Sequence, residues 1–134
     1  MSWRPTASIA VLELRARMLR AAREYFTATR ALEVETPALS GAAVSDVHLA
    51  SVTARALNQE RYLHTSPEYC MKRLLAAGCG DIWQIAKVYR DGESGRYHNP
   101  EFTMIEWYRV GIDHHSLMAD VERLISAMLP PDRQ

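Results

Sequence analysis

Two stretches rich in β-branched and aromatic residues constrain the fold of this chain most strongly. Asp81 to Tyr89 and Phe102 to Val110 both have the composition of β-strands. A polar, glycine-bearing loop from Arg90 to Pro100 joins them, and it is long for a hairpin turn. We expect the two strands to pair antiparallel in one sheet. Long ordered loops on rigid strands often hold functional residues, so this loop is the first candidate site.

Apolar residues at helical spacing predict one helix on each side of this region. The first helix has Thr6 or Ser8 as its N-cap and ends near Ala31. Its apolar positions are Val11, Leu14, Met18, Ala22 and Phe26. The last helix is capped by Asp113 and stops before Pro130-Pro131. Its apolar positions are Leu117, Val121, Leu124 and Met128. We expect the first helix to pack against the sheet.

Shorter segments follow the first helix. Leu32 to Glu35 alternates apolar and charged residues, which is the period of a half-buried strand. Pro37 then removes a backbone donor and ends that strand. The small residues from Ala38 to Ala43 indicate a loop.

A hairpin and a short helix complete the predicted elements. Val52 to Leu57 and Arg61 to His64 are predicted strands, joined by residues 58–60. Glu68 to Ala77 has one apolar face and closes on glycines, which predicts a short helix. The pattern of elements indicates an α+β fold in one domain that spans residues 1–134.

Composition excludes several classes of protein. The chain has 134 residues, of which 48% are hydrophobic, so it can bury a core and is not expected to be disordered. Sixteen basic residues balance sixteen acidic ones, so the chain is not expected to hold RNA by charge alone. Cys70 and Cys79 lack the spacing of a zinc site and are interpreted as free thiols in a reducing cytosol. No apolar run reaches membrane-spanning length, and we expect a cytoplasmic protein without a membrane partner.

The central loop carries groups suited to a nucleotide. Arg90 stands at the end of the first strand, Arg96 and His98 follow in the loop, and Phe102 opens the second strand. Arginine binds phosphate well because its planar fork donates two parallel hydrogen bonds, and an aromatic ring stacks on a base. A solvated turn of mixed charge has the same composition, so composition alone does not decide between the two interpretations.

The order of these residues resembles the signature motifs of class II aminoacyl-tRNA synthetases. Tyr89-Arg90, a loop, and then His98 to Phe102 are similar to the second motif, and His98 to Glu106 is similar to its lysyl-tRNA synthetase version. Leu32 to Pro37 resembles the first motif, which lies at the dimer interface in that family. Thr65 to Glu68 resembles the amino-acid-binding turn of the lysine enzymes. The resemblance implies an antiparallel sheet flanked by helices and a homodimer.

Three further segments are similar to the branch of this family that attaches lysine to elongation factor P without tRNA. They are Trp3 to Ser8, Met71 to Gly80 and Gly95 to Pro100. The resemblance implies a ligase with a role in translation that uses ATP and Mg²⁺, takes lysine or β-lysine, and acts on elongation factor P. Under this interpretation tRNA is not a partner.

By the same resemblance, Arg90 binds the α-phosphate of ATP and is the catalytic residue. An arginine suits this role because it neutralises the charge that develops in the displacement. The nucleotide-binding residues implied with it are Asp91, Glu93, His98, Asn99 and Phe102, where His98 reaches the outer phosphates and Phe102 stacks on adenine. Gly92 stands where many lysine enzymes have a glutamate, and Glu93 is the candidate to replace that contact.

The amino-acid side of the site is implied to consist of Ser66, Glu68, Glu106 and Tyr108. Glu68 pairs with a substrate ammonium in this interpretation, and it is also a carboxylate favoured at a helix start. Glu106 and Tyr108 are two residues apart on a strand, so they share a face. Glu106 is the more telling of the two, because a carboxylate in an apolar strand needs a partner.

The third motif of the family, a glycine-rich strand and helix that ends in an arginine, does not occur in this sequence. We therefore expect the chain to be the N-terminal part of a catalytic domain, with most Mg²⁺ ligands elsewhere, and to be inactive in isolation. Two alternatives stay open. One is a catalytic fragment of a lysyl-tRNA synthetase, and the other is a non-catalytic dimerisation or regulatory module of the same fold.

Overall fold

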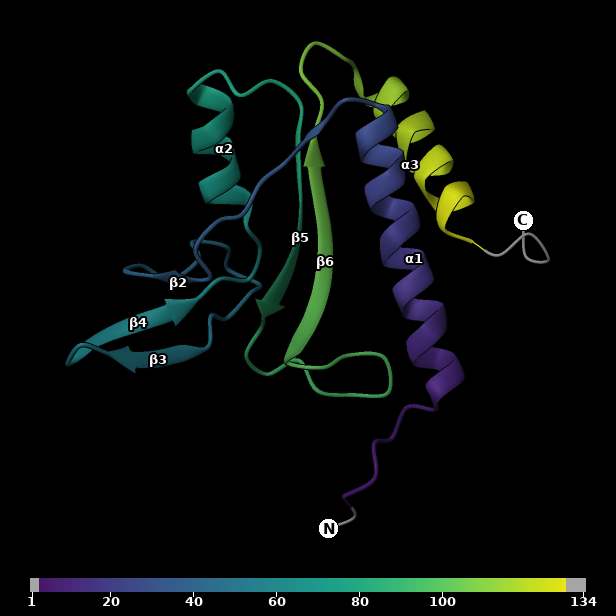
Figure 1. Cartoon of the computed structure of the whole chain (residues 1–134). Helices are drawn as coiled ribbons and strands as arrows, with labels where there is room; N and C mark the ends of the chain where they lie inside the picture. The colour runs from purple at the N-terminus through teal and green to yellow at the C-terminus, as the bar shows by residue number, and fades with distance from the viewer. Residues whose placement is uncertain (1–2, 130–134) are drawn as a thin grey trace. The chain divides into compact units, whose positions relative to one another are not determined.

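The computed structural model describes residues 3–129 (Figure 1). The elements in chain order are α1 (Ile9–Ala28), β1 (Leu32–Glu33), β2 (Leu39–Ser40), β3 (Thr53–Ala56), β4 (Gln59–Leu63), α2 (Glu68–Ala76), β5 (Ile82–Tyr89), β6 (Glu101–Tyr108) and α3 (His114–Met128). Helices and strands are both present, as the predicted α+β class requires. The chain divides into two compact units, one from Leu32 to Tyr108 and one that combines the segments before and after it.

The two long strands of the first unit confirm the central prediction. β5 and β6 pair antiparallel over eight residues each, from Ile82 opposite Tyr108 to Tyr89 opposite Glu101. β1 adds a parallel neighbour on the other side of β5, so this sheet is mixed rather than wholly antiparallel. Only Leu32 and Glu33 join the sheet, and the predicted strand to residue 35 is shorter than expected.

The second sheet of this unit has the order β2-β4-β3. The predicted hairpin is confirmed, but its turn is different: Leu57 and Asn58 form it alone, both with positive φ, and residues 59–60 belong to β4. The prediction of a loop from residue 38 to 43 is wrong at β2, which pairs with the free side of β4. That pairing gives hydrogen-bond partners to backbone groups that would otherwise lack them.

The register of β5 and β6 determines which side chains share a face. Residues directly opposite one another in an antiparallel pair point to the same side of the sheet. One face therefore carries Ile82, Gln84, Ala86 and Val88 together with Phe102, Met104, Glu106 and Tyr108.

α2 ends one residue earlier than predicted, and Gly78 and Gly80 follow it with positive φ, as a glycine-rich helix end requires.

The other unit contains α1 and α3, which pack against each other. Ser8 caps α1 by accepting a hydrogen bond from Val11, and α1 ends at Ala28, three residues before the predicted end. Asp113 caps α3 as predicted, because its carboxylate accepts the backbone N–H of Ser116 at 2.8 Å. α3 ends at Met128, and Pro130-Pro131 lie outside the described residues.

A buried ion pair fastens α3 to the segment that precedes it. The Nε of Arg109 lies 2.9 Å from the Oδ2 of Asp120, and the two side chains are 7% and 6% exposed. The hydroxyl of Tyr25 on α1 also donates to Asp120. Removing one partner of a buried ion pair is costly, so the contacts of Asp120 with Arg109 and Tyr25 stabilise the packing of α3 against α1. None of the helices in residues 3–129 has the length and hydropathy needed to cross a membrane.

Candidate functional site

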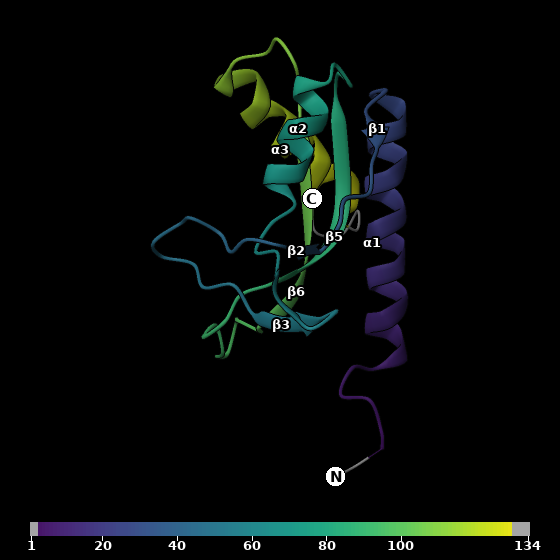
Figure 2. The same cartoon turned by 90° about the vertical axis from the view of Figure 1, so that its left-hand side faces the viewer.

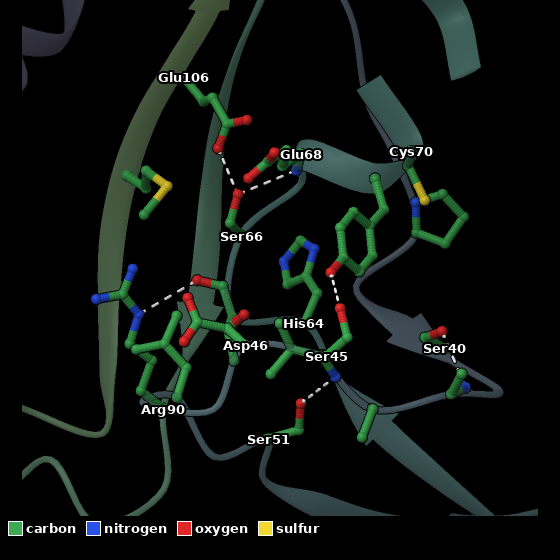
Figure 3. A pocket seen from close by; sticks show the side chains of 18 residues that line it. Ser40, Ser45, Asp46, Ser51, His64, Ser66, Glu68, Cys70, Arg90 and Glu106 are labelled. Atoms are coloured by element: carbon green, nitrogen blue, oxygen red, sulfur yellow. Dashed lines mark hydrogen bonds between the residues drawn. The ribbon is translucent and has the colours of Figure 1, made fainter. Parts of the chain in front are cut away.

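A cavity of about 600 Å³ lies in the unit that contains the two sheets (Figure 3). It is lined by Pro37 and Ser40, by the loop between β2 and β3, by the turn from His64 to Ser66, by the start of α2, and by Arg90, Met104 and Glu106. Its volume is in the range of pockets that bind small molecules. The cavity therefore joins the predicted amino-acid turn to the face of β6 that carries the predicted carboxylate.

Glu106 is the centre of a hydrogen-bonded network in this cavity. The Ser66 hydroxyl donates to Oε2 of Glu106 at 2.5 Å, and the Tyr108 hydroxyl donates to Oε1 at 2.6 Å. The Ser66 oxygen also accepts the backbone N–H of Glu68 at 3.0 Å. The four residues predicted to meet the amino acid thus lie together, in one chain of contacts. Two hydroxyl donors orient the carboxylate but leave its negative charge intact.

The environment of Tyr108 keeps its hydroxyl protonated. Burial raises the pKa of Tyr108 above its ordinary value of 10.0, and the hydrogen bond to Glu106 raises it further. Both causes oppose a second negative charge beside a carboxylate. Tyr108 therefore acts as a hydrogen-bond donor to Glu106 throughout the neutral pH range.

Glu68 stands at the first position of α2 and lines the same cavity. Its carboxylate forms an exposed ion pair with Lys72, one turn further along the helix. Exposed pairs of this kind contribute little to stability, and they exchange partners at small cost. Glu68 thus fits both interpretations given above: it is a carboxylate at a helix start, and it faces the cavity.

Arg90 lines the cavity from the end of β5. Its Nε donates to the backbone oxygen of Thr65 at 3.4 Å, and its Nη1 lies 3.7 Å from Oε1 of Glu93. The guanidinium carbon is 5.1 Å from the centroid of the Phe102 ring. These contacts hold the arginine at the edge of the cavity while its side chain stays partly accessible.

The other predicted nucleotide-binding residues do not line this cavity. Asp91, His98 and Asn99 are exposed on the loop, and Phe102 is half-buried under Arg90. The backbone N–H of Gly95 donates to the His98 oxygen, which closes the tip of the loop. The roles given to these residues stay predictions. Gly92 has a φ of +76°, a conformation that favours glycine, so a turn requirement explains why glutamate is absent there.

Sequence reasoning missed several cavity residues. His64 lines the cavity with its Nε2 at 2.7 Å from the backbone oxygen of Lys87, and Asp46 lines it from the loop between β2 and β3. Tyr69 fixes that loop, because its hydroxyl is 2.7 Å from the Ser45 hydroxyl. The position of His64 directly before the Thr65 to Glu68 turn was the one available signal for it. The loop gave no signal, because its small and polar residues have no periodicity.

Metal-ligating side chains do not cluster in the part of the chain that the structure describes. Among residues 3–129, no group of three or more histidine, cysteine, aspartate or glutamate side chains is arranged to hold a metal ion. No Mg²⁺ ligand is therefore assigned in this part of the chain.

Relatives of the chain are ligases and synthetases. The family described as "tRNA synthetases class II (D, K and N)" matches residues 1–131. A protein from Pseudoalteromonas translucida named elongation factor P–(R)-β-lysine ligase is 53% identical over an alignment 133 residues long, which covers 95% of this chain and 41% of that protein. The protein of the same name from Vibrio cholerae is 52% identical, with the same coverage. The chain thus spans about two-fifths of the length of these relatives.

Solved structures share the fold. The asparaginyl-tRNA synthetase from Pyrococcus horikoshii, complexed with asparaginyl-adenylate, has a TM-score of 0.80 at 24% identity, over 89% of this chain and 27% of that one. A putative aspartyl-tRNA synthetase from Leishmania major has a TM-score of 0.77 at 19% identity, over 89% and 22%. The family match covers nearly the whole sequence and the fold agrees with it, so the chain belongs to the class II tRNA synthetases of the D, K and N group.

Proposed function

We propose that this chain supplies the amino-acid side of an ATP-dependent, adenylate-forming ligase that attaches a lysine-type residue to a lysine of elongation factor P. One observation carries the proposal. Glu106 accepts the hydroxyls of Ser66 and Tyr108, and it faces the same cavity as Arg90. A fixed carboxylate suits the ammonium group of an amino acid, and a fixed arginine suits the phosphate that the carboxylate of this amino acid attacks. The names of the relatives point to the same class of reaction.

The two charged regions of the cavity have separate roles in the proposed activation step. Glu106 and Glu68 bind the ammonium groups of lysine or β-lysine. Arg90 binds the α-phosphate of ATP as an oxygen of the substrate carboxylate attacks phosphorus. A bond forms between the α-phosphorus and the carboxylate oxygen of the amino acid. The bond between the α-phosphorus and the oxygen that bridges to the β-phosphate breaks, and pyrophosphate leaves with the electron pair. A fixed cation lowers the barrier because negative charge develops on the α-phosphate oxygens.

The remaining nucleotide contacts are proposed for the loop after β5. Asp91, Glu93, His98 and Asn99 are the polar candidates, and Phe102 provides a ring for adenine. ATP is used with Mg²⁺ in reactions of this type, where the ion neutralises phosphate charge.

The proposed enzyme is a homodimer that acts in the cytoplasm. Exposed apolar residues on α1 support self-association: Ile9 is 71% exposed, Val11 54% and Leu12 46%. The balance of basic and acidic residues supports a protein acceptor rather than tRNA, because a tRNA ligand favours a basic surface.

The test uses a chimera in which this chain replaces the matching segment of the Vibrio cholerae relative. We expect lysine-dependent exchange between ATP and pyrophosphate, and we expect Arg90→Ala to reduce it by about 100- to 1000-fold, or about 2.7–4 kcal/mol. Arg73→Ala is the matched control, since Arg73 is an exposed arginine on α2 that does not line the cavity. Exchange that Arg90→Ala leaves intact would refute the role of Arg90. Lysylation of tRNA in place of elongation factor P would favour the lysyl-tRNA synthetase alternative.

A further inference from the structure

One wall of the cavity has no role in the proposed activation step. It is formed by the loop of residues 41–52, which connects β2 to β3 and projects away from β5 and β6 in Figure 2. Asp46 is the charged residue that this loop contributes to the cavity lining. Resting on the proposed function, we propose that Asp46 binds the acceptor amine, the lysine side chain of the protein that receives the activated amino acid.

The three cavity carboxylates differ in the contacts they already make. Glu106 accepts a hydroxyl on each oxygen, and Glu68 pairs with Lys72. Asp46 accepts the backbone N–H of His48 on Oδ1 at 2.8 Å, and no cation of residues 3–129 forms an ion pair with it. Asp46 is also exposed. Asp46 is therefore an exposed carboxylate whose Oδ2 is available to a cation that arrives from outside.

The loop holds this carboxylate in a defined place. The Ser45 and Tyr69 hydroxyls are 2.7 Å apart, which ties the loop to α2, and the N–H of Val44 donates to Ser51 at 3.1 Å. The bond from His48 to Asp46 closes a local turn around the aspartate. Figure 3 shows Asp46 among the side chains that surround the cavity. A loop fastened at both sides presents its carboxylate with little loss of entropy on binding.

Charge explains why a third carboxylate is useful. A lysine-type amino acid has two ammonium groups, and Glu68 and Glu106 account for both. The acceptor lysine is a third cation at neutral pH, because a lysine side chain ordinarily titrates near pH 10.4. It has to approach the carbonyl carbon of the adenylate, whose phosphate is bound by Arg90. Arg90 would repel this cation, and Asp46, which lines the same cavity, offsets the repulsion.

The transfer step balances without further reactants. The bound ammonium releases a proton to water, and the nitrogen lone pair attacks the carbonyl carbon of the aminoacyl adenylate. The C–N bond forms, the C–O bond to the phosphate breaks, and AMP leaves with the electron pair. The new amide nitrogen then loses its second proton to water. Asp46 positions the amine in this sequence and does not form a covalent bond.

The experiment compares the two half-reactions in the chimera described above. Asp46→Asn removes the charge but keeps an oxygen for the His48 N–H. We expect kcat/KM for elongation factor P to fall at least tenfold more than lysine-dependent pyrophosphate exchange, mainly through KM of the acceptor. Transfer to Nα-acetyl-lysine amide should fall to a similar degree, because the contact is with the amine itself. Asp46→Glu should restore part of the loss.

Glu60→Gln is the matched control, since Glu60 is an exposed carboxylate on β4 outside the cavity. Thermal unfolding checks that each variant is folded, and Asp46→Ser, which also keeps an acceptor for the turn, replaces Asp46→Asn if that variant unfolds.

An equal loss in both half-reactions would overturn the proposal, because Asp46 would then hold the amino acid. A loss with elongation factor P but not with the small amine would also overturn it, as would no loss at all. A chimera that folds but shows no exchange contradicts the proposed function itself, and the inference falls with it.

Discussion

Glu106 shows how one residue gives a sheet face its chemistry. Its register partner on β5 is Gln84, which is buried and accepts the Thr36 hydroxyl at 3.0 Å. Two opposed polar residues on an otherwise largely apolar face of the strand pair serve packing poorly, because a buried polar group needs a partner. The hydroxyls of Ser66 and Tyr108 provide partners for Glu106 without cancelling its charge. A cationic ligand is the natural complement of that arrangement.

Tyr108→Phe tests this network through the pH dependence of stability. The pKa of Tyr108 is raised in the folded chain, so above about pH 10 the unfolded state has lost a proton that the folded state keeps. The stability that this tyrosine provides is therefore complete below pH 10 and declines as the pH rises further. At neutral pH the variant should be less stable by about 1 kcal/mol, for the lost hydrogen bond. The difference between the two proteins should narrow in urea unfolding measured from pH 9 to 11.5. A stability difference between the two proteins that stays constant over this pH range would contradict the raised pKa of Tyr108.

The clustering of Ser66, Glu68, Glu106 and Tyr108 could be predicted because these residues belong to short motifs with fixed neighbours. Ser66 and Glu68 lie in one tetrapeptide, and Glu106 and Tyr108 lie two apart on one strand, where period two places them on one face. Asp46 and His64 were not predictable. Their positions in the cavity depend on how the loop after β2 folds back toward α2, which no local pattern encodes.

At the scale of elements, the hairpin of β3 and β4 carries a strained turn. Leu57 has a φ of +52° and Asn58 of +59°, the conformation of a two-residue turn that favours asparagine and glycine. A leucine in the left-handed region is costly, by roughly 1–2 kcal/mol. The Leu57 side chain is 90% exposed, so burial offsets little of that cost.

Leu57→Gly should therefore stabilise the chain. Relief of the left-handed conformation outweighs the greater freedom that glycine has in the unfolded chain, and the net gain should be up to about 1 kcal/mol. Ala56→Gly is the control one residue earlier, at the last residue of β3, and it should destabilise the chain by about 0.5–1 kcal/mol. Thermal unfolding followed by circular dichroism measures both. Equal destabilisation by the two changes would show that Leu57 is not strained.

Long elements were predicted within a few residues, whereas the short strands were missed or misjudged. α3, β5 and β6 each have enough residues to show a period or a biased composition. β1 and β2 have two residues each, and they are strands only because a distant segment pairs with them. Pairing of this kind is a tertiary property that overrides local propensity. The two-residue turn was missed for a related reason, since Leu57 is atypical at a position with positive φ.

At the scale of the whole molecule, the exposed apolar side chains of α1 predict self-association. Ile9 and Leu12 lie one turn apart on α1 and are 71% and 46% exposed, and exposed apolar clusters mark interaction surfaces. Light scattering of the chain at tens of micromolar should show dimers that dissociate on dilution. Ile9→Glu with Leu12→Glu should shift the equilibrium toward monomers, while Arg17→Glu, at an exposed polar position of the same helix, should change it little. A strict monomer at these concentrations would contradict the proposed dimer.

The isolated chain allows the catalytic activity of a partial site to be measured directly. It contains Arg90 and the carboxylate network, but it spans about two-fifths of the length of its ligase relatives. Groups that stabilise one transition state act together, so losing several of them removes far more activity than their share of the site. We expect the 134-residue chain to bind ATP weakly at best and to show negligible lysine-dependent pyrophosphate exchange.

The same assay on the chimera, with lysine and with β-lysine, supplies the reference rate. The isolated chain should still bind lysine weakly, as measured by calorimetry, because Glu106 and its partners Ser66 and Tyr108 all lie within residues 32–108. Glu106→Gln should abolish this binding. The chain would then hold its amino acid without activating it. Robust exchange by the chain alone would show instead that Arg90 and its neighbours suffice for the chemistry, and the cavity would have to be regarded as a whole active site rather than as one side of it.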